Sequence, residues 1–306
     1  MLKLVNYKLK YDFAPNRIGM MLHNNVVDLE QAFKQMIEND DSQESVCPPP
    51  HDPETFYAQA PSSIKTAEKV YTYIQNHQPQ TQYKREDVIL ETPVPNPSKI
   101  ICTGINYADH IKEMGSEPPE FPVLFSKFTN ALIGPEDDIH KINATKKLDY
   151  EVELAVVIGK KASNVKKEDV YDYIAGYTIA NDTSARDLQK RTVQWLQGKS
   201  LDHTTPIGPW LVTKDELTDP ANLKIQSSVN GEVRQSSNTK HLIFDIPFLI
   251  SFISELITLN PGDIILTGTA DGVGLAMDPP QFLQDGDIVK VEIEEIGFME
   301  NKITDR

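Results

Sequence analysis

Three carboxylates at the ends of two apolar segments are the strongest indication of chemistry in the sequence. In residues 148–158 every even-numbered position is apolar, a period-2 pattern typical of a strand, whereas the odd-numbered positions begin with Asp149, Glu151 and Glu153. Glu151 and Glu153 should therefore point to the same side of the strand, about 7 Å apart. A second apolar segment ends at Asp182. Carboxylates that converge from strand ends would form an all-oxygen site suited to a hard divalent cation such as Mg²⁺ or Mn²⁺.

The Glu-x-Glu pair also has two alternative roles. Such a pair on a strand is most often part of a solvated face, but the rest of the 148–158 segment is too hydrophobic for an outer edge. Asp182 also precedes a predicted helix start, where backbone N–H groups and Arg186 could gather an anionic ligand. A glycosidase acid–base pair is the weaker alternative, because such pairs flank a sugar from opposite sides.

A histidine and a glutamate three residues apart form the second candidate. His110 and Glu113 lie in a short predicted helix, which would stack them on one face. A carboxylate that touches an imidazole fixes its tautomer and raises its basicity, as the activation of a water molecule requires. The alternative is an ordinary surface pair. Glycine and proline residues directly after this helix suit a lid that orders over a substrate.

Other polar residues lie near these candidates in the sequence. Arg186 and Gln189 share a face of the helix predicted over residues 184–195, next to Asp182. Lys199 follows that helix and could clamp an anion between carboxylates, although alone it would be an ordinary loop lysine. Lys127 belongs to a predicted strand and could face the site, but we expect it to be solvated, as most strand lysines are.

A glycine-rich loop at residues 268–274 is the last candidate. It is neither a Walker loop nor a dinucleotide-binding fingerprint, because it has no following Lys-Ser/Thr and no GxGxxG. We expect it to provide close backbone approach together with the Thr269 hydroxyl. A tight β-turn without a binding role is the alternative.

The elements that position these residues fall into two predicted domains. Three alternating prolines at residues 93–97 can continue neither a helix nor a strand, and they separate a small α/β cap domain at residues 1–92 from a β-rich domain at residues 98–306. The first domain is predicted to contain a strand at 2–9, a hairpin at 17–29, helices at 30–38 and 63–75, and an irregular stretch at 39–63. The second is predicted to contain strands at 99–102, 122–127, 175–181, 264–267 and 287–294, a hairpin at 223–236 around Asn230-Gly231, and helices at 163–173, 184–195 and 245–259.

Composition limits the classes of function. The formal net charge of −15 over 306 residues argues against nucleic acid or an anionic membrane as a partner. Two cysteines provide neither a disulfide framework nor a thiolate zinc site. The N-terminus lacks the long apolar stretch of a signal peptide, and no apolar run approaches 18 residues. We therefore expect a cytoplasmic, soluble protein.

Five ordered motifs resemble those of the fumarylacetoacetate hydrolase family, and the similarity spans about residues 98–300. The motifs read GINYADHIKE at 104–113, DYEVELAVVIG at 149–159, GYTIANDTSARDLQ at 176–189, GKSLD at 198–202 and LTGTADGVG at 266–274. The resemblance implies an α+β, β-rich fold, with a rolled, barrel-like mixed sheet as its core, and a homodimer. The family commonly has Thr-Gly-Thr-Pro in the last motif, where this chain has Ala270; that removes no ligand.

The resemblance also implies roles for particular residues. One Mg²⁺, Mn²⁺ or Ca²⁺ ion would be held by Glu151, Glu153 and Asp182, and His110 with Glu113 would activate water on a segment that closes over the ligand. The implied contacts to the 2-oxo acid end of the substrate come from Arg186, Gln189, Lys199 and Thr269.

These roles lead to an expected reaction class. A 2-oxo acid that chelates the metal places the cation where enolate charge develops. We expect cleavage of a C–C bond, either oxaloacetate decarboxylation or acylpyruvate hydrolysis. Isomerisation or decarboxylation of a muconate-type 2-hydroxy-dienedioate is an alternative, and a catalytically idle metal-binding protein is a second one.

Overall fold

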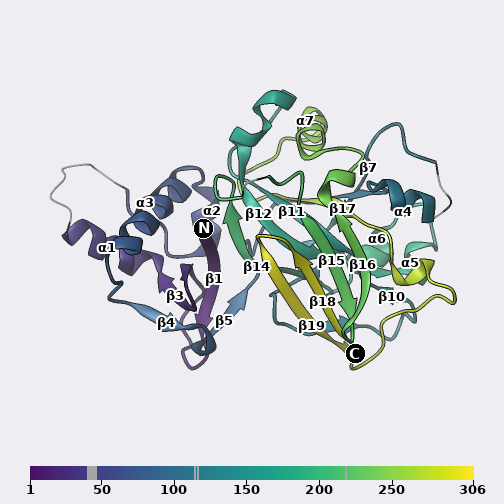
Figure 1. The fold of residues 1–306 in the computed structure, drawn as a ribbon, viewed down its shortest axis with the longest axis horizontal. Helices are drawn as coiled ribbons and strands as arrows, with labels where there is room; N and C mark the ends of the chain where they lie inside the picture. Colours follow the sequence, from purple (N-terminus) through teal and green to yellow (C-terminus); the bar gives the residue numbers. More distant parts are fainter. Residues whose placement is uncertain (40–46, 114, 116, 218) are drawn as a thin grey trace.

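The computed structural model describes residues 1–39, 47–113, 115, 117–217 and 219–306. Its largest element is a 12-stranded sheet, in which β17–β6 and β14–β8 pair in parallel and the other pairs are antiparallel (Figure 1). The path through this sheet is β4 (Gln82–Lys84), β3 (Asn25–Asp28), β2 (Arg17–Leu22), β1 (Lys3–Leu9), β14 (Thr205–Thr213), β12 (Ile174–Asn181), β11 (Val152–Ile158), β17 (Ile264–Thr269), β6 (Ile100–Gly104) and β7 (Val123–Lys127), with β5 (Val88–Glu91) on β1 and β8 (Leu132–Ile133) on β14.

Two smaller sheets complete the β structure. One has five strands in the order β16 (Glu232–Asn238), β15 (Lys224–Val229), β18 (Ile288–Ile293), β19 (Gly297–Asp305) and β9 (Ile139–Lys141), and the other pairs β10 (Leu148–Asp149) with β13 (Ser184–Ala185). The strand-rich α+β fold is confirmed. In the described residues the path through the large sheet ends at β4 and β7, so the sheet is open and does not close into a barrel.

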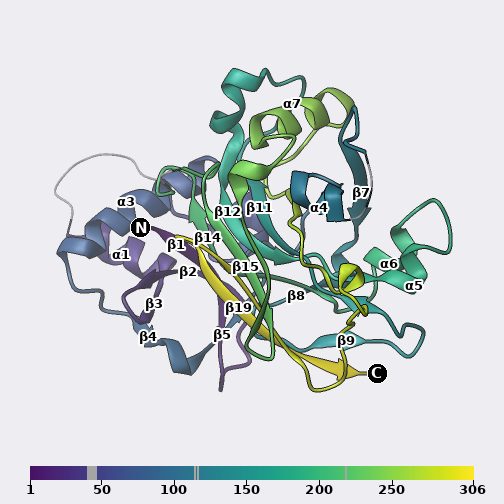
Figure 2. The same ribbon diagram turned by 45° about the vertical axis from the view of Figure 1, so that its right-hand side comes forward.

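The helices are short and lie around the sheets. They are α1 (Leu29–Glu38), α2 (Pro53–Ala58), α3 (Ser62–Asn76), α4 (Ala108–Glu113), α5 (Arg186–Gln189), α6 (Leu196–Lys199) and α7 (Ile246–Leu256), with 3₁₀ turns η1 (Arg85–Asp87), η2 (Thr129–Ala131), η3 (Lys167–Tyr173), η4 (Thr239–His241) and η5 (Gly274–Ala276). Figures 1 and 2 show α4, α5 and α6 on the side of the molecule away from α1 and α3. None of the helices in the described part of the chain is long and apolar enough to cross a membrane.

The alternation along β11 explains why this strand lies in the middle of the large sheet. Val152, Leu154 and the even-numbered residues after them pack into one hydrophobic cluster, which includes side chains of β15 and β18. Ala155 and Val157 pack into a second cluster, which includes side chains of α1 and α3. Both faces of β11 are therefore buried, one of them against the five-stranded sheet, as a central strand requires.

The N-terminal strands continue the same large sheet. β1 pairs with β14 through Lys3↔Val212 and Leu4↔Leu211, and β5 returns to pair with β1. The prolines at residues 93–97 lie directly after β5. The division into domains at 1–92 and 98–306 stays a prediction.

Several predicted elements differ from the structure. Within the range predicted as a helix, 184–195, Ser184 and Ala185 are extended in β13 and only the single turn α5 is an α-helix; a second turn, α6, begins at Leu196, after this range. The predicted helix at 163–173 is only the 3₁₀ turn η3, because Asn164 has a φ of 51° and its N–H bonds Ser254 O. The stretch predicted as irregular contains α2, and its residues 40–46 lie outside the described part of the chain. The last strand, β19, has no counterpart among the predicted elements.

Candidate active site

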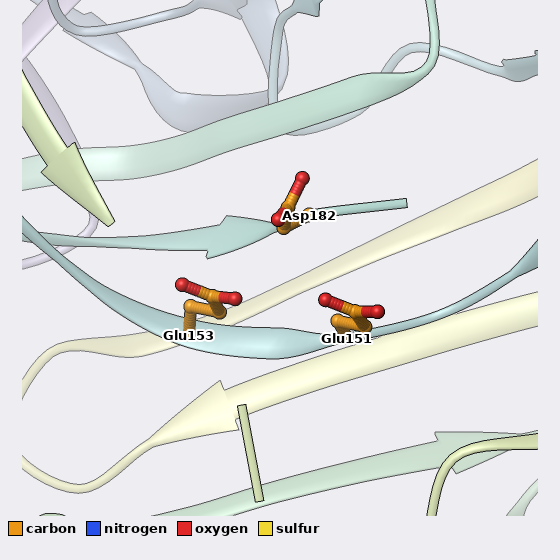
Figure 3. Close-up of side chains that lie close together, drawn as sticks. All are labelled: Glu151, Glu153 and Asp182. Atoms are coloured by element: carbon orange, nitrogen blue, oxygen red, sulfur yellow. The ribbon is translucent and has the colours of Figure 1, made fainter. Parts of the chain in front are cut away.

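The antiparallel pairing of β11 and β12 brings the three carboxylates together. Val152 pairs with Asn181, and the Asp182 N–H donates to Glu151 O at 2.9 Å, so the end of β12 lies beside the start of β11. Ligand atoms of Glu151, Glu153 and Asp182 all lie within 4.8 Å of one another, and all three side chains are buried (Figure 3). This is the convergence that the spacing of these residues predicts.

Two buried lysines hold Asp182. Lys199 Nζ lies 2.6 Å from Asp182 Oδ2 and 2.8 Å from Glu151 Oε2. Lys127 Nζ lies 2.7 Å from Asp182 Oδ1 and also donates to Thr183 O at 3.2 Å. The expectation that Lys127 is solvated is wrong, because its side chain is fully buried at the end of β7. A lysine is buried in this way only where it has a charged partner.

Arg186 is bound on two of its three nitrogens. Nε donates to Asp149 Oδ2 at 2.8 Å, and Nη1 lies 2.7 Å from Glu151 Oε1 and 3.2 Å from Gln189 Oε1. Nη2 is buried and has no hydrogen-bond partner among the described residues. An unpaired guanidinium N–H is costly to bury, and a ligand carboxylate within reach would accept its hydrogen bond.

The two glutamates differ in their electrostatic surroundings. Burial raises the pKa of Glu151, but Lys199 and Arg186 outweigh burial and bring this pKa to about 2. Burial and the carboxylates of Asp182 and Glu151 hold the pKa of Glu153 well above its usual range. Glu153 accepts from the Gly268 N–H at 2.7 Å, and no ion pair joins it to a basic side chain of the described residues. A cation among these acids would therefore relieve their repulsion, so the residues fit a divalent metal.

The glycine-rich loop donates backbone N–H groups to three acids from different parts of the chain. Gly268 donates to Glu153, Gly272 donates to Glu113 Oε1 at 2.9 Å, and Gly274 donates to Asp149 Oδ1 at 2.8 Å. Gly268 and Gly272 have φ values of 104° and 91°, which a glycine adopts without strain. Close backbone approach is thus the use that the structure makes of this loop.

His110 and Glu113 are in contact on α4. His110 Nδ1 lies 3.2 Å from Glu113 Oε2. If Nδ1 carries the proton of the neutral ring, it donates to Glu113, and Nε2 keeps a free lone pair. Because Glu113 is also held by the Gly272 N–H, α4 is joined to the glycine-rich loop.

A cavity of about 360 Å³ connects these groups. Seven of the nine candidate residues line it, namely His110, Glu151, Glu153, Arg186, Gln189, Lys199 and Thr269. The other two, Asp182 and Glu113, contact Lys199 and His110 respectively. Part of the remaining wall is apolar, from Ile105, Phe125 and Trp195. The structure therefore gathers all nine candidates around one cavity.

Two charged residues of the site, Asp149 and Lys127, are not among the nine candidates from the sequence. Asp149 is fully buried and accepts hydrogen bonds from Arg186, Gly274 and Leu275. Its place in the strand pattern, on the same alternation as Glu151, could have indicated it. Lys127 carried no such signal, since its partner Asp182 is 55 residues away in the sequence.

Known proteins share both the sequence and the fold. Rat oxaloacetate tautomerase Fahd2a, a mitochondrial protein by its name, is 51% identical over 220 residues, which cover 72% of this chain and 70% of the rat protein. The solved structure of a fumarylacetoacetate hydrolase from Exiguobacterium antarcticum is 34% identical, covers 100% of both chains and has a TM-score of 0.77. A maleylpyruvate hydrolase from Sphingobium, solved with manganese(II) and pyruvate, is 29% identical, covers 99% of both chains and has a TM-score of 0.75.

The family follows from these similarities. Residues 99–304 match the family described as "Fumarylacetoacetate (FAA) hydrolase C-terminal". The manganese in the Sphingobium structure and the buried acids of this chain both support a divalent metal. The cytoplasmic location expected from the sequence stays a prediction. The chain is an enzyme of the fumarylacetoacetate hydrolase family.

Proposed function

We propose that this enzyme interconverts the keto and enol forms of oxaloacetate or a closely similar 2-oxo diacid, with one Mg²⁺ or Mn²⁺ ion at Glu151, Glu153 and Asp182. The observation that carries the proposal is the Arg186 side chain, which lines the same cavity as Glu151 and Glu153 and whose buried Nη2 has no hydrogen-bond partner among the described residues. It provides a place for a substrate carboxylate next to the metal ligands. The 51% identity with the rat oxaloacetate tautomerase supports this choice of reaction.

The acid triad is the part of the site that would hold the metal. Buried carboxylate oxygens are the ligands that Mg²⁺ and Mn²⁺ prefer. When bound, the ion supplies Lewis-acid stabilisation of the negative charge that develops on the 2-oxo oxygen.

Arg186 and Lys199 bind and orient the acid end of the substrate. Asp149 and Glu151 bind the guanidinium through Nε and Nη1, so the position of Nη2, which carries two N–H groups, is fixed. Burial lowers the pKa of Lys199, but Asp182 and Glu151 outweigh burial and raise it, so this lysine stays charged. Both cations are thus in place before the substrate arrives.

His110 is the residue placed to move the proton. With Nδ1–H directed to Glu113, Nε2 can accept a proton from the carbon next to the 2-oxo group. Return of that proton to the enolate oxygen gives the enol, and its return to carbon gives the keto form. Neither direction consumes water or another reactant.

C–C bond cleavage is the second candidate function. Loss of CO₂ from oxaloacetate, or hydrolysis of an acylpyruvate by water that His110 activates, produces the same kind of enolate. The similarity to maleylpyruvate hydrolase favours this candidate. Isomerisation of a muconate-type diacid and a catalytically idle protein are the remaining alternatives.

The test follows the ultraviolet absorbance of enol-oxaloacetate with the purified protein, with Mn²⁺ and then with EDTA. We expect Mn²⁺-dependent loss of the enol signal without formation of pyruvate, and a decrease of about 10²- to 10⁴-fold in His110→Ala. His77→Ala, on the exposed end of α3, is the matched control. Pyruvate formed at the rate of enol loss would favour decarboxylation, and turnover of acetylpyruvate would favour hydrolysis. If the protein binds Mn²⁺ but converts none of these substrates, the result would favour the catalytically idle protein.

The homodimer is a further proposal, supported by the resemblance to the family alone. Light scattering during size-exclusion chromatography measures the mass directly. A mass near twice 34.4 kDa is expected, and a mass near 34.4 kDa would contradict the proposal.

A further inference from the structure

Gln235 reaches the active site from the second sheet. It lies on β16, and its side chain is completely buried. Oε1 accepts from the Val152 N–H at 3.1 Å and from the Ser227 hydroxyl at 2.9 Å. Nε2 donates to Thr269 Oγ1 at 2.8 Å and to Ala270 O at 2.9 Å. All four hydrogen bonds that an amide side chain commonly makes are therefore formed.

Val152 is the residue between the two glutamates of the acid triad. Its C=O accepts the Thr269 hydroxyl at 2.9 Å, so both of its backbone groups bond to side chains. The pairing of β11 with β17 shifts register between Glu153 and Ala155. At this irregularity the side chains of Gln235 and Thr269 connect β11 to the glycine-rich loop by hydrogen bonds. In a regular antiparallel ladder, backbone hydrogen bonds would make this connection.

The same hydrogen bonds orient the Thr269 hydroxyl. Its proton goes to Val152 O, and one lone pair accepts from Gln235 Nε2. A threonine oxygen has two lone pairs, so a single acceptor position is left. Since Thr269 lines the cavity, it offers an acceptor to the ligand and would match a hydroxyl group such as that of an enol.

We propose that Gln235 is a positioning residue, which holds the Glu151–Glu153 segment and the Thr269 hydroxyl in a fixed relation. This inference rests on the proposed function, because it assigns Gln235 to the metal and enol site. Gln235 does not line the cavity, so it acts through Val152 and Thr269. Residues that orient metal ligands in this way typically change metal affinity or activity by about 10- to 100-fold when they are replaced.

The first test is Gln235→Met, which keeps the volume and removes all four hydrogen bonds. The matched control is Ser227→Ala, which removes a bond to the same amide but none to Val152 or Thr269. Mn²⁺ dissociation constants are measured by electron paramagnetic resonance, together with kcat and KM for enol-oxaloacetate and the urea midpoint. We expect Mn²⁺ binding at least about 10-fold weaker and a lower kcat in Gln235→Met, and values within about twofold of wild type in Ser227→Ala.

A purely structural role gives a different pattern. In that case Gln235→Met lowers the urea midpoint but leaves the Mn²⁺ dissociation constant and kcat within twofold of wild type, and the proposal is overturned. If Gln235→Met does not fold, Gln235→Asn is measured in its place by the same criteria, because it keeps the polar groups but is one methylene too short to reach both partners. Folded wild-type protein that binds no Mn²⁺ would refute the proposed function instead, so the two failures are distinguishable.

Coupling to Thr269 is the second test. If Gln235 acts through this hydroxyl, Thr269→Val and Gln235→Met together should lower kcat no more than the stronger single substitution does. Fully multiplicative effects would show that the two side chains act independently, against the proposal.

Discussion

Replacing Glu153 by glutamine should stabilise the metal-free protein. Glu153 is buried with two other carboxylates, and burial together with Asp182 and Glu151 raises its pKa. Glutamine has nearly the same shape, keeps an oxygen for the Gly268 N–H and carries no charge. The substitution therefore removes the repulsion and retains the packing.

The gain in stability has an upper limit, because the wild type can avoid the repulsion by protonating Glu153. In the unfolded chain a glutamate has a pKa of about 4.3, so protonating it at pH 7 costs about 4 kcal/mol, and its burial cannot destabilise the folded state by more than this. Repulsion from one carboxylate at 4.8 Å is about 3.5 kcal/mol at an effective dielectric constant of 20, which is close to that limit. The side-chain N–H of the new glutamine would have no acceptor, which lowers the free energy of unfolding by about 1 kcal/mol. We expect Glu153→Gln to gain about 2–3 kcal/mol at pH 7.

The stability advantage of Glu153→Gln should increase with pH. The folded-state pKa of Glu153 is raised, so the wild type binds more protons when folded and loses stability relative to the variant as pH rises above about 4.3. The assay is urea unfolding in EDTA between pH 4.5 and 8, with Glu168→Gln, an exposed position, as the control. The advantage of Glu153→Gln should be absent at pH 4.5 and should grow as the pH rises to 7 and 8.

Bound metal should reduce the stability gain of Glu153→Gln, because it stabilises the wild type more than the variant. Mn²⁺ at 100 times its dissociation constant stabilises the wild type by about 2.7 kcal/mol, and the variant, which lacks one ligand, much less. The difference in stability should therefore shrink or change sign on adding Mn²⁺. A variant that is less stable than wild type in EDTA at pH 7, or whose advantage does not change with pH, would refute the electrostatic reasoning.

Three further substitutions test other contacts of the site. Lys127→Met leaves Asp182 with one buried cation where it has two, so the free energy of unfolding should fall by about 3–5 kcal/mol in urea titrations. Arg186→Lys keeps the charge but removes the free Nη2, so kcat/KM for oxaloacetate should fall about 10- to 100-fold in steady-state kinetics, mainly through KM. Gly272→Ala would place a Cβ 2.1 Å from a backbone oxygen at a φ of 91°, and calorimetry should show a larger loss of stability than for Gly231→Ala, which has a similar φ and open space.

The strand that carries the glutamates could be predicted because its pattern is local. The alternation in residues 148–158 reflects the two hydrophobic clusters on the two faces of β11, and each face has its own set of apolar residues. The contact between His110 and Glu113 also follows from helical spacing alone. The convergence of Asp182 on the glutamates needed one assumption more, that β11 and β12 are antiparallel neighbours.

The features that could not be predicted depend on contacts distant in the sequence. Burial of Lys127 is determined by Asp182, and the four hydrogen bonds of Gln235 are determined by the packing of one sheet on another. The helix predicted at 184–195 begins only after Ala185, because Ser184 and Ala185 pair with Asp149 and Leu148 of β10. Helical periodicity contains no information on such pairing.

The charges around the cavity suggest an order of binding. Among the described residues that form this site, four buried carboxylates meet three cations, namely Asp149, Glu151, Glu153 and Asp182 against Lys127, Arg186 and Lys199. With every group ionised, the site has one surplus negative charge, and a proton on Glu153 only brings it to neutral, so in a chain whose net charge is −15 the metal-free site does not attract an anionic substrate. A divalent cation reverses the sign of the site to one surplus positive charge, which one substrate carboxylate neutralises. Binding of metal and of 2-oxo acid should therefore be mutually favourable, so the dissociation constant of the acid must fall as Mn²⁺ is added, and that of Mn²⁺ must fall by the same factor as the acid is added.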